Sequence, residues 1–230
     1  MIVPLKNMNE GKLLHYLPCN HSPHCVTVVD TSSTPSSRHT LAVSLPFEKT
    51  IDILEVTDQR IQVNKSLKVN EEYSALAAMN NKTLAVGNLE EDSRVDILSL
   101  NGQLLCSISS ASCPFRMITT TSAELIFSSW ENGSIVKVNS FDGRVIFDIK
   151  VPQIANPSGI TIVSDDSLLV ADFKKLSLHL VSSGGRWLRQ VWTAPSTSAK
   201  DDKLRGVSIE SSLCVCVTRR GFAYVLDAVY

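Results

Sequence analysis

The sequence predicts an all-β protein, a β-propeller whose blades are four-stranded antiparallel sheets. Three observations carry this prediction: β-rich segments recur at a steady period, turn signals recur at the same period, and no segment has the spacing of an amphipathic helix. Four strands in each repeat of about 40–45 residues are typical of a propeller blade. Helical solenoids are excluded by the Val, Ile and Thr content and by the closely spaced turns.

The first periodic feature is a short apolar run that contains a leucine. These leucines are Leu41, Leu84, Leu125, Leu168 and Leu213, at steps of 43, 41, 43 and 45 residues. We expect each run to be the second strand of its blade, covered on both faces by neighbouring blades, because such strands are almost entirely apolar. The third and fourth strands, as in residues 95–100 and 145–150, are expected to alternate because they approach the rim.

The second periodic feature is a pair of turn residues. The pairs are Glu10-Gly11, Asp58-Gln59, Asn101-Gly102, Asp142-Gly143 and Gly184-Gly185. Asn-Gly and Asp-Gly between apolar runs are strong hairpin signals, since both residues tolerate positive φ. Two series with one period are hard to produce by accident.

Together these signals divide residues 1–230 into blades of one domain. Four complete blades are expected at about 25–69, 73–110, 115–151 and 158–193, with a partial blade at 1–17 and a three-stranded last blade at 205–230. In the third complete blade the strands are expected at 115–121, 124–130, 134–140 and 144–151.

Two ring sizes fit this strand count. In a five-bladed ring, residues 13–17 supply the missing outer strand of the last blade. In a six-bladed ring, residues 1–17 are the outer half of a first blade whose beginning lies upstream of this chain. Six blades are favoured, because residues 2–5 already resemble a third strand before its hairpin.

Composition limits the functional classes. The formal net charge is −1, which argues against a general electrostatic attraction to nucleic acid or anionic membrane. No apolar stretch approaches the ~18 residues of a spanning helix, and the N-terminus lacks the apolar run of a signal peptide. We therefore expect a cytoplasmic protein with no membrane partner, whose six cysteines are reduced.

The fourth complete blade carries a recognisable motif between residues 156 and 172. It resembles the NHL repeat, in which Pro-x-Gly-Ile opens the first strand and Leu-x-Val-x-Asp forms the second; the matching residues are Pro157, Gly159, Ile160, Leu168, Val170 and Asp172. The other blades match only in strand spacing and turns. The chain looks most like the divergent propellers of TRIM-NHL proteins of invertebrates, without their RING, B-box and coiled-coil modules.

This resemblance implies that the propeller selects targets. The partner would be a protein recruited to a TRIM-like ubiquitin ligase, or alternatively an RNA under post-transcriptional regulation. Gluconolactonase-like and strictosidine-synthase-like propeller enzymes share the Pro-x-Gly-Ile and Val-x-Asp features and form a third possibility. Because hard cations need several converging oxygens and the ends of the second strands supply one carboxylate, Asp172, we expect no catalysis, no cofactor and no small-molecule substrate.

A cluster of thiols and imidazoles near the N-terminus is a weak zinc candidate. It consists of Cys19, His21, His24 and Cys25, residue types that satisfy tetrahedral zinc. Only five residues, including Pro23, separate the two cysteines, whereas zinc sites of this type have a longer loop between ligand pairs. A plain connecting loop with no metal is therefore favoured.

One face of the disc is expected to carry the connections between second and third strands. Acidic residues gather on the first three complete blades (Glu48, Glu90, Glu91, Asp92 and Glu131), and basic residues gather on the last two (Lys174, Lys175, Arg219 and Arg220). This predicts either ordinary solvated loop charge or a polarised docking surface. The candidate contact residues on it are Arg94, Trp130, Glu131, Asn132, Lys174, Lys175, Arg219 and Arg220.

Overall fold

The computed structural model describes residues 2–7, 12–18, 22–31, 38–57, 60–88, 93–110, 112–129, 131–163, 166–194, 204–210, 213–218 and 223–227. In these residues the secondary structure is β-strand apart from one short 3-10 helix, Pro46–Glu48. The chain divides into two compact units, Met1–Cys113 and Pro114–Tyr230, and each is described by itself.

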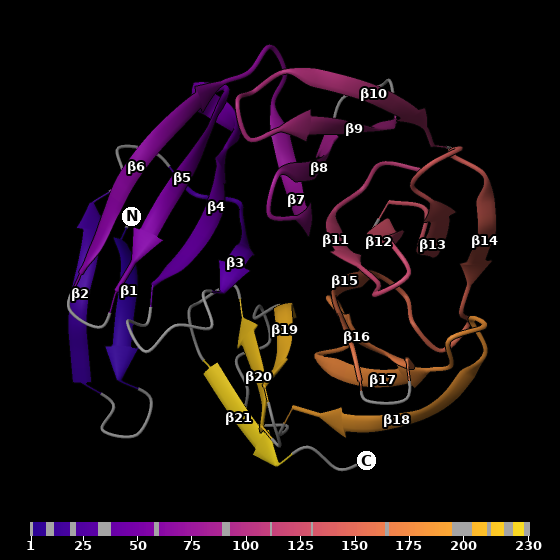
Figure 1. Ribbon diagram of the computed structural model, residues 1–230. Coiled ribbons are helices and arrows are strands. Elements are labelled where there is room, and N and C mark those ends of the chain that lie inside the picture. Colours follow the sequence, from indigo (N-terminus) through magenta and orange to yellow (C-terminus); the bar gives the residue numbers. More distant parts are fainter. Residues whose placement is uncertain are drawn as a thin grey trace. The chain divides into compact units, whose positions relative to one another are not determined.

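Unit 1 contains three antiparallel sheets (Figure 1). The first pairs β1 (Ile2–Asn7) with β2 (Lys12–Pro18). The second contains β3 (Cys25–Thr31), β4 (His39–Leu45), β5 (Thr50–Val56) and β6 (Ile61–Lys68), and the third contains β7 (Tyr73–Asn80), β8 (Thr83–Asn88), β9 (Arg94–Ser99) and β10 (Leu104–Ser109).

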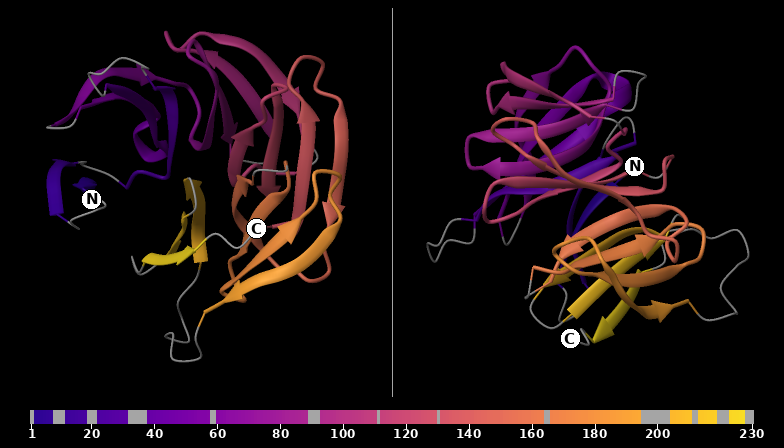
Figure 2. Two further views of the ribbon diagram at one scale, coloured as in Figure 1. Left: turned by 60° about the horizontal axis from the view of Figure 1, so that its bottom comes forward. Right: turned by 90° about the vertical axis from the view of Figure 1, so that its right-hand side faces the viewer.

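Unit 2 also contains three antiparallel sheets, which Figure 2 shows from two further directions. The first is formed by β11 (Arg116–Thr119), β12 (Glu124–Ser129), β13 (Ser134–Asn139) and β14 (Val145–Lys150). The second is formed by β15 (Pro157–Ile162), β16 (Leu168–Asp172), β17 (Ser177–Val181) and β18 (Trp187–Thr193), and the third by β19 (Leu204–Glu210), β20 (Leu213–Thr218) and β21 (Ala223–Asp227).

Every four-stranded sheet is a meander in which strands consecutive in sequence pair with each other. The four complete blades predicted from the repeat coincide with these four sheets. The described residues form four four-stranded blades and not the expected five or six, since β19–β21 make a three-stranded sheet and β1–β2 a two-stranded one. The prediction differed because it counted the partial sheets at both ends as blades.

Glycine turns join third and fourth strands where the sequence predicted them. Gly102, Gly143 and Gly185 have φ of 83°, 71° and 86°, a region that an L side chain rarely adopts. At Gly185 an added Cβ would also lie 2.6 Å from Ile149 Cδ1. The pairs at residues 10–11 and 58–59 lie outside the described residues.

Burial follows the position of a strand within its sheet. The second strands β8, β12 and β16 are buried almost throughout, as predicted for strands covered on both faces. The expected alternation of the third strands is wrong for β9, where Val95, Asp96, Ile97 and Leu98 are all buried. The third strand β9 is therefore buried on both faces. Most residues of the fourth strands β10 and β14 are exposed.

Neighbouring sheets within each unit share apolar cores. In unit 1, Ile51 and Leu67 pack with Leu76 and Leu84 of the next sheet. In unit 2, Ile126 and Ile135 pack with Ile160 and Leu168. No described helix has the length and apolarity needed to cross a bilayer.

Candidate functional site

Three backbone segments meet at one edge of the first two sheets of unit 2. They are the turn between β12 and β13, the connection from β14 to β15 (residues 151–156), and the turn between β16 and β17. Each turn ends on a residue in the left-handed region, Gly133 with φ 65° and Leu176 with φ 52°. A Cβ at Gly133 would lie 3.1 Å from the Ala155 carbonyl oxygen, so the first turn and the connection are close neighbours. We call this edge the candidate face.

The carboxylate of Asp172 ties two of these segments together. Its Oδ2 accepts a hydrogen bond from the Ala155 N–H at 2.7 Å, and its Oδ1 accepts from the N–H groups of Lys174 and Lys175 at 3.0 and 3.1 Å. The residue is completely buried. Hydrogen bonds from backbone donors to an ionised carboxylate are stronger than neutral ones. The NHL-like aspartate is therefore a structural clamp for the turn and the connection.

The candidate face exposes both signs of charge. Lys174, Lys175 and Glu131 are exposed. The Lys175 ammonium donates to the Gln153 carbonyl oxygen at 2.7 Å, which adds a second link between the turn and the connection. Asn132 is also exposed beside Glu131. The β16–β17 turn thus presents charged side chains on a backbone that is bonded to Asp172 and to the connection.

The structure brings together some of the predicted contact residues. Glu131, Asn132, Lys174 and Lys175 share the candidate face of unit 2, whereas Arg94 belongs to unit 1. Trp130, Arg219 and Arg220 lie outside the described residues, as do Glu90, Glu91 and Asp92. The acidic and basic halves of a whole disc therefore stay a prediction.

Arg94 lies in a salt-bridge network instead of a loop. It is the first residue of β9, and its Nε lies 3.1 Å from Asp96 Oδ2 while its Nη2 lies 3.1 Å from Glu71 Oε1. Arg94 and Asp96 are two residues apart on a strand, so they share a face. The hydrogen bond and charge of Asp96 raise the pKa of Arg94 above its usual range.

Asp96 is the centre of this network, and the sequence analysis missed it. The Tyr73 hydroxyl donates to its Oδ2 at 2.5 Å and the Ser107 hydroxyl to its Oδ1 at 2.6 Å, and Asp96 itself is completely buried. Burial, followed by the hydrogen bond and charge of Asp96, raises the pKa of Tyr73 well above its ordinary value. The one available sequence signal was a carboxylate inside an apolar strand, which needs partners when buried.

A second buried polar group lies beneath the candidate face. The Trp187 indole N–H donates to His179 Nδ1 at 3.3 Å, and His179 Nε2 lies 2.9 Å from Ser177 Oγ. Because an indole only donates, Nδ1 accepts and Nε2 carries the proton of a neutral imidazole. Burial lowers the pKa of His179, the charge of Asp172 acts in the opposite direction, and Lys175 lowers it further.

The zinc candidate is only partly described, since Cys19 and His21 lie outside the described residues. The Cys25 thiol lies 3.7 Å from the Leu76 carbonyl oxygen and packs against the core of unit 1. The His24 ring meets Phe47 edge-on, with 6.3 Å between ring centroids. No cluster of three or more His, Cys, Asp or Glu side chains suited to a metal occurs in the part of the chain that the structure describes.

Solved structures place this architecture among β-propellers. Virginiamycin B lyase from Staphylococcus aureus aligns over 98% of this chain and 77% of its own, with a TM-score of 0.65 and 14% identity. The WD40 β-propeller domain of Doa1 aligns over 91% of this chain and 66% of its own, with a TM-score of 0.60 and 13% identity. A Bacteroides caccae protein of unknown function aligns over 79% and 71%, with a TM-score of 0.55 and 17% identity.

These likenesses show the fold alone: the chain is an all-β propeller of four-stranded antiparallel blades. No family profile and no curated protein matches the sequence. The expected membership of the NHL or TRIM-NHL group therefore has no support beyond the motif at residues 157–172.

Replacing Asp172 by Asn should destabilise unit 2. An amide side chain has one acceptor oxygen and one donor nitrogen, so either the Ala155 N–H or the two lysine N–H groups would face a donor. A buried donor without its partner costs about 1–3 kcal/mol of unfolding free energy. Urea denaturation measures this, and the exposed Asp148, changed to Asn, is the matched control, expected to stay within about 0.5 kcal/mol of wild type. Equal stabilities of the two variants would contradict the clamp.

His179 should make stability depend on pH. Its pKa is lower in the folded protein than the unfolded value of about 6.5, so the unfolded state binds the proton first as pH falls. The stabilising contribution is therefore present above about pH 6.5 and is lost below it. Denaturation of wild type and His179→Gln across this range measures the difference, with pH 8 giving the intrinsic cost of the substitution. If the free energy of unfolding fell by the same amount in both proteins below pH 6.5, His179 would not be the source of the pH dependence.

Proposed function

We propose that the chain is a non-catalytic binding platform that recognises a protein partner through the candidate face. The observation that carries this proposal is the clamped turn between β16 and β17, which presents Lys174 and Lys175 on a backbone that Asp172 fixes to the neighbouring connection. A surface that is already ordered loses less entropy on binding than a loop that must be ordered first. This favours recognition at the turns.

The mixture of charges favours a protein over RNA. Phosphate binding is driven by several basic side chains acting together, whereas this face carries Glu131 and Asn132 at the same edge as the two lysines, and Lys175 already donates to Gln153. The net charge of −1 adds no general attraction to a polyanion. We infer that the partner carries complementary charges of both signs.

The finer assignment is recruitment of a substrate to a TRIM-like ubiquitin ligase in the cytoplasm. It rests on the resemblance of residues 157–172 to the NHL repeat and stays a prediction. RNA recognition in post-transcriptional regulation is the alternative that the same resemblance implies.

Charge reversal on the face tests the proposal. The double variant Lys174→Glu, Lys175→Glu should weaken capture of the partner about tenfold or more, since like charges placed together at an interface cost several kcal/mol. Quantitative mass spectrometry of proteins captured by the full chain, with and without RNase, is the measurement.

The matched control is the double variant Arg144→Glu, Arg189→Glu, which makes the same change in charge beside β14 and on β18, away from the candidate face. Both of these side chains are exposed. The control should capture the partner as wild type does, and RNase should have no effect. Equal loss in both double variants would refute the role of the face, and loss on RNase treatment would establish RNA as the ligand instead.

A further inference from the structure

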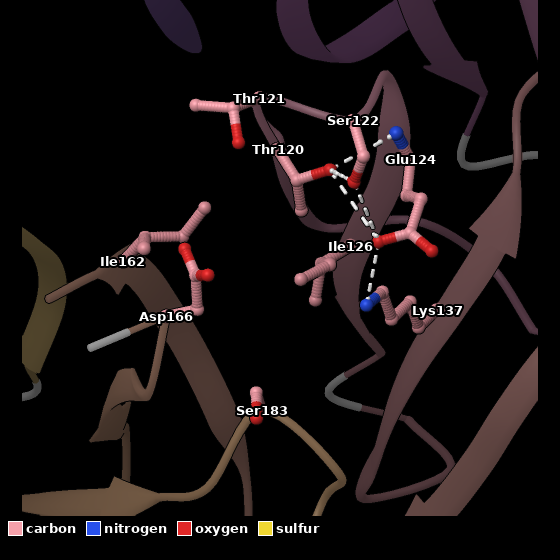
Figure 3. Close-up of a pocket in the computed structure, with 9 residues that line it drawn as sticks. All are labelled: Thr120, Thr121, Ser122, Glu124, Ile126, Lys137, Ile162, Asp166 and Ser183. Atoms are coloured by element: carbon pink, nitrogen blue, oxygen red, sulfur yellow. Dashed lines mark hydrogen bonds and ion pairs between the residues drawn. The ribbon is translucent and has the colours of Figure 1, made fainter. Parts of the chain in front are cut away.

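A small polar pocket lies at the opposite edge of unit 2, between its first two sheets. Its volume is about 90 Å³, and on the same measure a cavity needs about 10–15 Å³ to hold one water molecule, so it has room for a group of a few non-hydrogen atoms. The turn from β11 to β12 and strand β13 form one wall, and the turns that precede β16 and β18 form the other (Figure 3).

The first wall is held in place by an ion pair. The Lys137 ammonium lies 2.6 Å from Glu124 Oε2, to which the Ser122 hydroxyl donates at 3.1 Å. Thr120 Oγ1 accepts the Glu124 N–H at 3.0 Å. The hydrogen bond to Lys137 lowers the pKa of Glu124. The two opposite charges on this wall therefore cancel, and hydroxyl groups lie beside them.

The second wall carries a carboxylate without a partner among the described residues. Asp166 is exposed, and its backbone is fixed by an N–H bond to the Val163 carbonyl oxygen at 3.1 Å with φ at 61°. Figure 3 shows Asp166 and Ser183 across the pocket from Glu124 with no interaction to the other residues drawn. Because Lys137 compensates Glu124, the pocket retains one negative charge.

We propose that this pocket binds a primary ammonium group, from a small free amine or from a lysine side chain of another protein. An ammonium has three donors and no acceptor, which matches the Asp166 carboxylate and the hydroxyl oxygens of Thr121 and Ser183. The aliphatic side chains of Ile126 and Ile162, which also line the pocket, suit the methylene groups next to the nitrogen.

Other ligand classes fit the pocket less well. The uncompensated carboxylate of Asp166 repels a phosphate or carboxylate ligand. A hard cation such as Ca²⁺ needs six or more oxygens, whereas Glu124 is already engaged by Lys137. The proposal is independent of the protein-binding role, because the pocket and the candidate face lie at opposite ends of the strands of unit 2.

NMR titration of the full chain with propylammonium chloride tests the proposal. We expect the amide signals of Thr121 and Asp166 to shift with a Kd in roughly the millimolar range, the affinity of a ligand worth about 4 kcal/mol. Sodium chloride at the same ionic strength should leave them in place. Equal shifts with both salts, or no shift with propylammonium, would overturn the proposal.

A pair of variants locates the site. Asp166→Asn keeps the size of the side chain and tolerates the positive φ, and should weaken propylammonium binding about tenfold, or 1.4 kcal/mol. Asp148→Asn removes the same charge from exposed β14 and should bind as wild type does. Unchanged binding by the Asp166 variant would overturn the proposal.

A second arm separates the two sources of the ammonium. An acetylated and amidated Gly-Lys-Gly peptide is titrated beside propylammonium. Tighter binding of the peptide that depends on Asp166 would identify a partner's lysine as the ligand, and equal binding of both would identify small free amines.

Discussion

One buried carboxylate fixes the backbone of the surface to which we assign binding. Asp172 accepts N–H bonds from Ala155 on one oxygen and from Lys174 and Lys175 on the other. The two lysines therefore sit on a turn whose conformation is set from inside the sheet. Without these hydrogen bonds the turn would have to be ordered on binding, and the lost entropy would weaken the affinity for the partner.

Buried polar side chains with hydrogen-bond partners also occur elsewhere in both units. The third strands β9 and β17 are also largely buried, and each polar group buried in them needs a partner. In unit 1, Asp96 gathers Tyr73, Arg94 and Ser107. In unit 2, His179 gathers Trp187 and Ser177. Each cluster links strands of one sheet through side chains, and the His179 cluster belongs to the sheet that carries Lys174 and Lys175.

Periodicity made most of the fold predictable. The leucine series placed the buried second strands, and Gly102, Gly143 and Gly185 marked turns whose positive φ the structure has. The extent of the third-strand burial was not predictable, because Asp96 reads as the polar position of an alternating strand until its partners from β7 and β10 are placed beside it. The expected number of blades was wrong for a related reason, since a strand count does not say which partial sheets complete a blade.

The candidate site was predictable only in part. Strand phasing put Glu131, Asn132, Lys174 and Lys175 at the same edge, since hairpins at equal positions in neighbouring blades lie on one side. Spacing did not reveal that Asp172 would bind three backbone N–H groups, because its partners come from a connection and a turn about 20 residues apart. The ammonium pocket could not be predicted from the sequence. Its walls belong to different sheets, and its net charge depends on the pairing of Glu124 with Lys137.

Residue-resolved hydrogen exchange tests the central claim most directly. The clamp predicts that the amides of Ala155, Lys174 and Lys175 exchange at least about tenfold more slowly than those of Glu131 and Gly184, which are exposed turn residues without a described backbone hydrogen bond from their own N–H. Exchange of all five at the same rate would show that Asp172 does not hold the turn and the connection, and would contradict the account.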